Sequence, residues 1–208
     1  MTERERTEVA SPPHALRNAT VGVMFVTALA SALMAVSLAP EALYALEGDD
    51  AVDLGELATA KLDASWSGRY VRATASLDGA QPISFRRVGE PGERRIAAVP
   101  LSAVGPRLVD YAVPPRERGA RFMPPTQLSG RLERVPELGL RHRGLARAVG
   151  ALTGGRFGES WLLVDGDDPK SSRWTLALEA LLLAFFAFNA GGILRILRRV
   201  PAAKAASK

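Results

Sequence analysis

The stretch ATVGVMFVTALASALMAVSLA at residues 19–39 and the stretch WTLALEALLLAFFAFNAGGIL at residues 174–194 decide how this chain of 208 residues is organised. Each is long enough to cross the hydrocarbon core of a bilayer, about 30 Å thick, as a helix that rises about 1.5 Å per residue. The sequence therefore predicts a membrane protein with two transmembrane helices that bracket one domain. The predicted divisions are a tail (1–18), a first transmembrane helix (19–41), an outer domain (42–172), a second transmembrane helix (173–194) and a basic tail (195–208).

The first apolar stretch has a second interpretation, because the small residues at 35–39 resemble the cleavage site of a signal peptide. Its apolar length, however, exceeds the roughly 7–15 residues of a signal-peptide core. The residues before it also mix acids with arginines, whereas a signal peptide begins with a plainly basic region. These features favour a retained membrane anchor. The second stretch begins at Trp174, a residue type that is common at membrane interfaces, and we expect it to stay in the membrane.

Lysine and arginine near the ends of the two stretches predict the orientation of the chain. Acids follow the first stretch, whereas the tail after the second stretch is purely basic. Both termini are therefore predicted to be cytoplasmic and the domain extracytoplasmic. A high content of Arg, Ala and Gly is typical of GC-rich bacterial genomes, which favours a bacterial inner membrane and a periplasmic domain. The basic residues expected at the membrane surface are Arg195, Arg198, Arg199, Lys204 and Lys208.

Charge and cysteine content narrow the possible functions. The basic tail alone accounts for the net charge of +5, so membrane lipids are the expected partners and nucleic acid is not. The chain contains no cysteine, which excludes disulfides, thiolate catalysis and cysteine-ligated metals. The outer domain must then be stabilised by its own core.

Between the spans, the hydrophobic pattern changes from helical to alternating. Apolar residues at 52–62 recur with helical spacing and predict a short amphipathic helix. The pair Asp78 and Gly79 predicts a hairpin between the first two strands, and residues 138–152 predict one more helix. A small α+β domain, arranged as a partly closed β-barrel or a sandwich, is therefore expected. The predicted strands are 70–77, 82–87, 95–99, 107–113, 127–134 and 160–164.

Small residues recur at helical spacing within both apolar stretches, and such rows allow helices to pack closely in a membrane. These rows have three interpretations. The two spans pack on each other, they pack on helices of another membrane protein, or alanine is simply abundant in this chain. Glu179 lies inside the second stretch, where it can either reach water at the interface or contact another helix. The candidates for helix packing are Ala28, Ala32, Ala35, Ala39, Ala180, Ala184, Ala187 and Gly191.

Residue types that carry catalysis or bind metals are sparse. His14 lies in the first tail, and His142 lies between two arginines that would repel a metal cation. Asp165, Asp167 and Asp168 have the charge density of a calcium loop, but they lack the distal glutamate of an EF-hand, which favours a turn into the second span. The sequence therefore predicts no catalytic, cofactor-binding or metal-binding residues.

Four segments resemble the surfeit-locus family of cytochrome c oxidase assembly proteins, as does the arrangement of two spans around a β-rich domain. The segments are YVRATASLDG (70–79), AAVPL (97–101), DYAVP (110–114) and LSGRL (128–132). The family's Arg-Gly-Trp-Val-Pro stretch is reduced here to Val113 and Pro114. Bacterial members are linked with haem a through a membrane histidine, which neither span has. The resemblance thus implies a role in assembly and does not imply haem binding.

Two functions from different classes remain. The first is a non-enzymatic membrane accessory or assembly protein, with a respiratory complex as the candidate partner. Its contacts would include Glu179, Phe122 and Met123, although Phe122 and Met123 could instead close the edge of the core. The alternative is a membrane-tethered ligand sensor or enzyme with an Arg-lined outer pocket, in which Asp110 or Glu133 acts as an acid or base.

Overall fold

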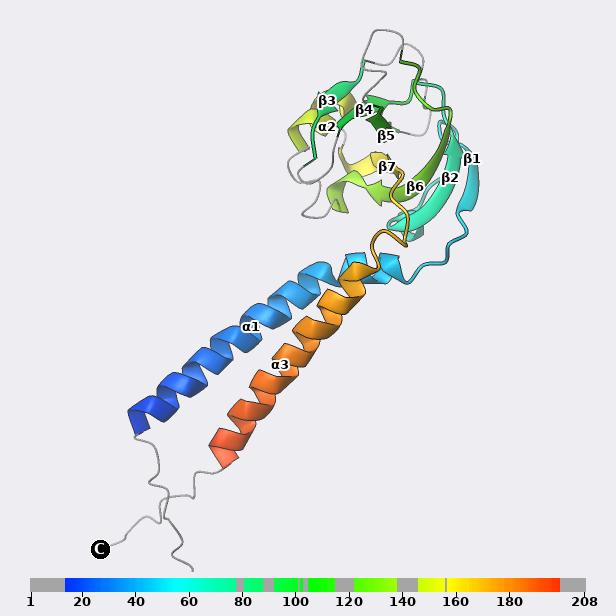
Figure 1. Ribbon diagram of the computed structural model, residues 1–208. Coiled ribbons are helices and arrows are strands. Elements are labelled where there is room, and N and C mark those ends of the chain that lie inside the picture. Colours follow the sequence, from blue (N-terminus) through cyan, green and yellow to red (C-terminus); the bar gives the residue numbers. More distant parts are fainter. Residues whose placement is uncertain are drawn as a thin grey trace, which may run out of the picture. The chain divides into compact units, whose positions relative to one another are not determined.

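The computed structural model describes residues 14–77, 81–87, 92–100, 102, 105–114, 122–137, 146–155 and 157–198. The chain divides into two compact units (Figure 1). The helical unit comprises the described parts of Met1–Ala39 and Thr175–Lys208, and the sheet domain is Pro40–Trp174.

Two long helices carry the apolar stretches, namely α1 (His14–Ala45) and α3 (Trp174–Arg198). Both are long and apolar enough to cross a membrane by length and composition. The predicted first transmembrane helix covers residues 19–41, whereas α1 begins at His14 and continues through Pro40 to Ala45. Proline removes a single backbone donor. The helical residues after it belong to the sheet domain and are held there by side-chain contacts described below.

Within the helical unit, α1 and α3 contact each other. A Cβ atom added at Gly192 would lie 2.1 Å from Cε of Met24, so the Met24 side chain packs directly on this glycine. Ala28 and Ala35 of the predicted small-residue row are buried, as is Ser31 between them. The buried residues of α3 are Thr175, Leu182 and Asn189, which follow one another at intervals of seven.

The predicted row on α3 lies elsewhere on that helix. Ala180, Ala184, Ala187 and Gly191 are exposed, whereas Ala32 and Ala39 of α1 are half-buried. The helix pair therefore does not use the α3 row. Small residues on α1 and the close approach at Gly192 already allow contact, so α3 can present larger side chains to its partner. Packing of the exposed row on another protein's helices stays a prediction.

Seven strands form a single mixed sheet, which curls around the main core of the domain (Figure 1). Its order is β1-β2-β6-β7-β5-β4-β3, with β1 and β3 at the edges. The pairs β1/β2 and β5/β7 are parallel and the other four are antiparallel. The strands are β1 (Val52–Glu56), β2 (Arg69–Thr74), β3 (Ile83–Phe85), β4 (Glu93–Ala98), β5 (Arg107–Val113), β6 (Gln127–Arg134) and β7 (Trp161–Asp165).

Short helical elements complete the domain, which is therefore α+β as predicted. One sheet, and not the two sheets of a sandwich, accounts for the seven strands. The remaining elements are the 3₁₀ turns η1 (Ala64–Trp66), η3 (Val135–Glu137) and η5 (Phe157–Glu159), and the helix α2 (Ala146–Thr153). The predicted helix at 138–152 is thus present in its second half, and residues 138–145 lie outside the described part of the chain.

Neighbouring strand residues point to opposite faces of the sheet, and each face has its own core. On β4, Ile96 joins the smaller cluster, which includes Val149 of α2. The next residue, Ala97, joins the main cluster inside the curved sheet. On β7, Leu163 joins the main cluster and Val164 the smaller one. This alternation matters for the site described below, because β6 directs Arg131 and Glu133 to the face of Val164 and Leu162.

Two local predictions were wrong. Residues 52–56 form the edge strand β1, not a helix, because β2 supplies parallel backbone pairing and Gly55 adopts a φ of 66° that interrupts helical geometry. The predicted hairpin between the first two strands is absent from the sheet order, since β2 pairs with β1 and β6 whereas β3 pairs with β4. Residues 78 and 79 themselves lie outside the described residues.

Candidate functional site

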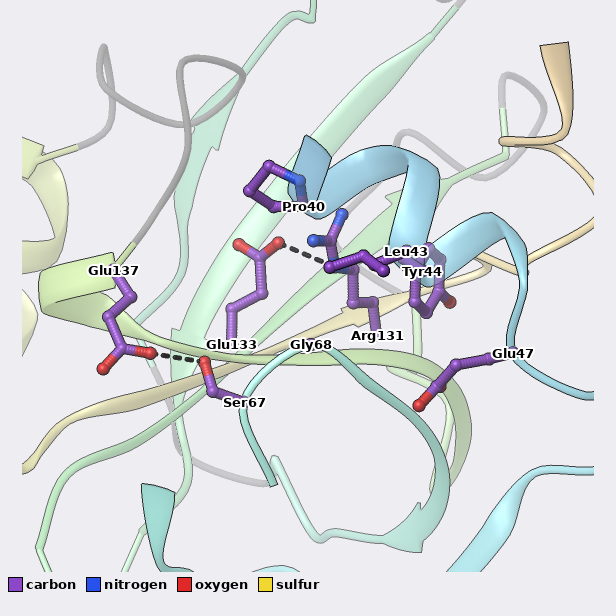
Figure 2. A pocket seen from close by; sticks show the side chains of 9 residues that line it. All are labelled: Pro40, Leu43, Tyr44, Glu47, Ser67, Gly68, Arg131, Glu133 and Glu137. Atoms are coloured by element: carbon purple, nitrogen blue, oxygen red, sulfur yellow. Dashed lines mark hydrogen bonds and ion pairs between the residues drawn. The ribbon is translucent and has the colours of Figure 1, made fainter. Parts of the chain in front are cut away.

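A half-open pocket of about 370 Å³ lies on the sheet domain where the last turns of α1 meet β6 (Figure 2). The end of α1 forms one wall, the turn before β2 forms a second, and β6 with η3 forms the third. The lining residues are Pro40, Leu43, Tyr44, Glu47, Ser67, Gly68, Arg131, Glu133 and Glu137.

Arg131 is the central cation of this pocket, with a side chain only 6% exposed. Its Nη1 donates to Oε2 of Glu41 at 2.7 Å, and its Nε lies 3.0 Å from Oε1 of Glu133. The guanidinium carbon also lies 4.5 Å from the centre of the Tyr44 ring. A buried charge is tolerated only when it is paired, and two carboxylates and an aromatic face provide that pairing here.

Tyr44 fixes the end of α1 on the domain. Its ring is 2% exposed, and its hydroxyl donates a hydrogen bond to the backbone carbonyl of Asp167. A little further along the chain, Asp49 forms ion pairs with Lys170 at 3.2 Å and with Arg173 at 3.1 Å. The chain therefore enters and leaves the sheet domain at neighbouring points, so both apolar helices connect to the same region of this domain.

The two remaining acids of the pocket have their own partners. Oε1 of Glu47 lies 3.2 Å from Nε of Arg69. Oε1 of Glu137 accepts from Nη1 of Arg134 at 2.8 Å, and its Oε2 accepts from the Ser67 hydroxyl at 2.7 Å. Each of the three glutamates that line the pocket is therefore paired with an arginine.

A second buried ion-pair cluster lies on the same face of the sheet, at β5. Asp110 is fully buried, and its Oδ2 lies 2.9 Å from Nη2 of Arg87 while its Oδ1 lies 2.8 Å from Nε of Arg94. Arg94 also donates to the backbone carbonyl of Asp165 at 3.0 Å. Because both oxygens of Asp110 are bonded to guanidiniums, this carboxylate acts as an internal counter-charge.

Asp165 lies beside this cluster at the end of β7. Burial is the largest cause of its raised pKa, which the backbone N–H of Ser129 and the charge of Arg94 partly oppose. Oδ1 of Asp165 accepts from the Ser129 amide at 3.0 Å, which holds the end of β7 against β6.

The acids 165–168 form the turn that the sequence favoured over a calcium loop. Gly166 follows β7 with a φ of 77°, and Asp168 accepts from the backbone amide of Ser171 at 2.7 Å. Among the residues that the structure describes, no group of three or more His, Asp or Glu side chains is arranged to hold a metal ion. His142 lies outside these residues.

The predicted contact residues occupy different environments. Phe122 packs against the main core and stacks on Tyr111, with ring centres 6.0 Å apart, so it closes an edge of the core. Met123 is 82% exposed. Glu179 is half-buried on α3, where its Oε2 has no hydrogen-bond partner in the described part of the chain.

The predicted basic groups are described only in part. Arg195 and Arg198 are exposed in the last turn of α3, whereas Arg199, Lys204 and Lys208 lie outside the described residues. The pocket itself is lined by one arginine and three glutamates, so it is not the Arg-lined pocket of the alternative function. Several arginines of the outer domain lie outside the described residues, and that alternative stays a prediction.

Sequence reasoning missed the assembly of Arg131, Glu41 and Tyr44. One feature of the sequence could have indicated it. Glu41 and Tyr44 stand three positions apart directly after Pro40, which places both on one face if the helix continues. Glu133 was considered only as an acid or base. Its Oε1 lies against Arg131, and the structure places it in the wall of the pocket.

No protein-family model, curated protein or solved structure matches this chain. The resemblance to the surfeit-locus family therefore stays a prediction.

Proposed function

We propose that this protein is a non-enzymatic accessory or assembly protein of a membrane complex, anchored by α1 and α3 and acting through its sheet domain. The observation that carries the proposal is the pair of long apolar helices that flank one domain. Both helices expose large apolar side chains along their length, including Phe25 and Val36 on α1 and Phe188 on α3. Such surfaces are stable in lipid and costly in water.

The environment of the buried acids supports an accessory role over catalysis. Asp110 is bonded at both oxygens, and Oε1 of Glu133 lies 3.0 Å from Arg131. Carboxylates paired in this way stabilise the fold and are poorly placed to exchange protons with a substrate. The two acids that the alternative function would use are therefore assigned to the structure of the domain.

The orientation proposed is two-pass, with both termini cytoplasmic and the sheet domain in the periplasm of a bacterium. The chain has no cysteine, so single-cysteine variants give an unambiguous test. A cysteine at the exposed Asp50 should react with a membrane-impermeant maleimide in intact spheroplasts, and one at the exposed Arg198 should react only after lysis. The reverse pattern would refute this orientation.

The partner complex is proposed to be respiratory, on the basis of the four segments that resemble surfeit-locus proteins. The test is mass spectrometry of proteins that co-purify with the tagged chain from native membranes in mild detergent. An unrelated two-span protein, expressed at the same level, is the control. Stoichiometric recovery of terminal-oxidase subunits or haem-synthesis enzymes is the expected result. Recovery of no stoichiometric membrane partner would refute an accessory role.

A further inference from the structure

We propose that the sheet domain contacts the membrane directly, with Leu43 in the lipid headgroup layer and Leu46 at its outer edge. This inference rests on the membrane anchoring in the proposed function and goes beyond it, because it assigns a lipid contact to the domain itself. Both leucines belong to the sheet domain, and each is 68% exposed. Large apolar side chains with this exposure mark a surface that another apolar phase covers.

The end of α1 has an inner face and an outer face. Ala42, Tyr44 and Ala45 are buried, and the Tyr44 hydroxyl bonds to the domain as described above. Leu43 lies between these buried residues and is exposed, so it points away from the domain. The backbone amide of Leu46 donates to the carbonyl of Leu43 at 3.1 Å, which continues the turn and keeps Leu46 near the same side.

The outer face continues the exposed apolar face of the predicted span. Leu29, Leu33 and Val36 are exposed on α1, at intervals of four and three residues. The same alternation of four and three next reaches Pro40, which is exposed, and then Leu43. Residues with these intervals share one face of a helix. The face that lipid covers along the span therefore leads directly to Leu43.

The length of α1 sets the expected depth of each leucine. The apolar stretch at 19–39 is about 31 Å long as a helix, which matches a hydrocarbon core of about 30 Å. The headgroup layer adds roughly 5–8 Å on each side of this core. Leu43 follows the stretch by about 6 Å of helix and Leu46 by about 10 Å. Leu43 is therefore within the headgroup layer, and Leu46 is at its outer edge.

The second connection of the domain carries residue types that suit the same layer. Trp174, the last residue of the sheet domain, is 64% exposed, and tryptophan is enriched at membrane interfaces. Its neighbour Arg173 forms an ion pair with Asp49, only three residues after Leu46. The two connections of the domain therefore lie close together, and both expose a large apolar side chain.

The distribution of exposed apolar side chains favours lipid over a protein partner. In the described part of the sheet domain, the large apolar residues that are exposed are Leu43, Leu46, Val52, Met123 and Trp174. Three of these five stand at the two connections to the apolar helices. A protein could bind any side of the domain, whereas lipid is available only beside the spans. The position of Leu43, Leu46 and Trp174 is therefore the one that lipid contact requires.

The test uses nitroxide labels on the full chain in phosphatidylcholine nanodiscs. The chain has no cysteine, so Leu43→Cys and Leu46→Cys can each be labelled at a single site. Val36→Cys is the control for lipid, and Met123→Cys, at an apolar residue that is 82% exposed, is the control for water. Power saturation measures the access of oxygen, which concentrates in lipid, and of a nickel chelate, which stays in water. Thermal midpoints equal to that of the unlabelled wild type show that each labelled variant is folded.

The ratio of oxygen access to nickel access should fall in the order 36, 43, 46, 123, and the ratio at 43 should lie nearer to that at 36 than to that at 123. Ratios at 43 and 46 equal to the ratio at 123 would overturn the inference, because both leucines would then be in water. Immobilised labels that neither reagent reaches would also overturn it, because a second copy of the chain would then cover this face.

The control at Val36 separates this inference from the proposed function. If the label at 36 is in lipid and the labels at 43 and 46 are in water, the lipid contact of the domain is refuted and the membrane anchor stands. If the label at 36 is in water, the anchor is refuted and the inference is refuted with it. If 43 is in lipid but co-purification recovers no partner, the inference stands and the accessory function is refuted.

Discussion

Replacing Asp110 by asparagine should cost the sheet domain about 3–5 kcal/mol, the usual range when one member of a buried ion pair is removed. Asp110 is fully buried, and the guanidiniums of Arg87 and Arg94 that bond its two oxygens are only 10% and 11% exposed. Asparagine preserves the shape of the side chain, so the loss reports the negative charge together with the one acceptor oxygen that the amide lacks. For a domain of this size, the expected fall in thermal midpoint is roughly 10 °C or more.

Urea unfolding of the full chain in detergent measures this loss, with the fluorescence of Trp66 and Trp161 reporting on the domain. Asp50→Asn is the control, because it removes the same charge from an exposed position. A loss for Asp110→Asn below about 1 kcal/mol, or one equal to that of the control, would refute the assignment of Asp110 as a buried counter-charge.

An apolar replacement of the whole cluster separates lost charge pairing from lost packing. The triple variant Asp110→Leu, Arg87→Met and Arg94→Met removes all three charges together and fills similar volumes. Its stability should recover most of the loss seen in Asp110→Asn, because burying an ion pair is itself costly. A triple variant as unstable as the single one would mean that these side chains stabilise the domain through packing and backbone contacts.

Three further variants test other parts of the domain. Burial raises the pKa of Asp165, so the folded state keeps this proton at pH values where the unfolded chain has lost it, and the free energy of unfolding should fall as pH rises from about 4 through the raised pKa. Asp165→Asn keeps the acceptor for the Ser129 amide and removes the titrating group. The urea midpoint of this variant should therefore lose that dependence on pH between about pH 4 and 7. Gly130→Ala places a Cβ 1.8 Å from the carbonyl oxygen of Val164, so we expect near-ultraviolet circular dichroism to show no folded protein. A urea midpoint equal to that of the wild type would contradict this close approach. Tyr44→Phe deletes a buried hydrogen bond and should lower the free energy of unfolding by about 1–2 kcal/mol in urea titrations, whereas an unchanged value would show that the hydroxyl does not hold the end of α1.

The sequence predicted the elements of this protein better than their pairing. Length and hydropathy located α1 and α3, and alternation located the strands at 107–113 and 127–134 to the residue. Strand pairing depends on contacts between distant segments. The turn residues at 78–79 predicted a hairpin with the next strand, whereas the antiparallel partner of β2 is β6. The helix predicted for residues 52–56 was wrong for a similar reason. Backbone hydrogen bonds to β2 stabilise a strand there more than the short helical pattern stabilises a helix.

The candidate pocket was harder to predict, because its members come from three separate segments of the chain. Glu41, Ser67, Arg131 and Glu137 are each ordinary polar residues in their local sequence. Local sequence suggests that an arginine between buried strand residues faces solvent. In the described part of the chain, Glu41 and Tyr44 at the end of α1 contact Arg131. The charge of the site therefore depends on which residues the fold brings together, and no local pattern encodes it.

Overall composition was a poor guide to the residues that line the pocket. The chain is basic overall, with Lys and Arg exceeding Asp and Glu by five, and its arginines suggested an Arg-lined pocket. The fold uses several of these arginines internally, since Arg87, Arg94 and Arg131 are nearly buried and bonded to carboxylates. Arginines that neutralise internal acids cannot attract an anion at the surface. The net charge of +5 therefore does not predict the charge of a partner that binds the sheet domain.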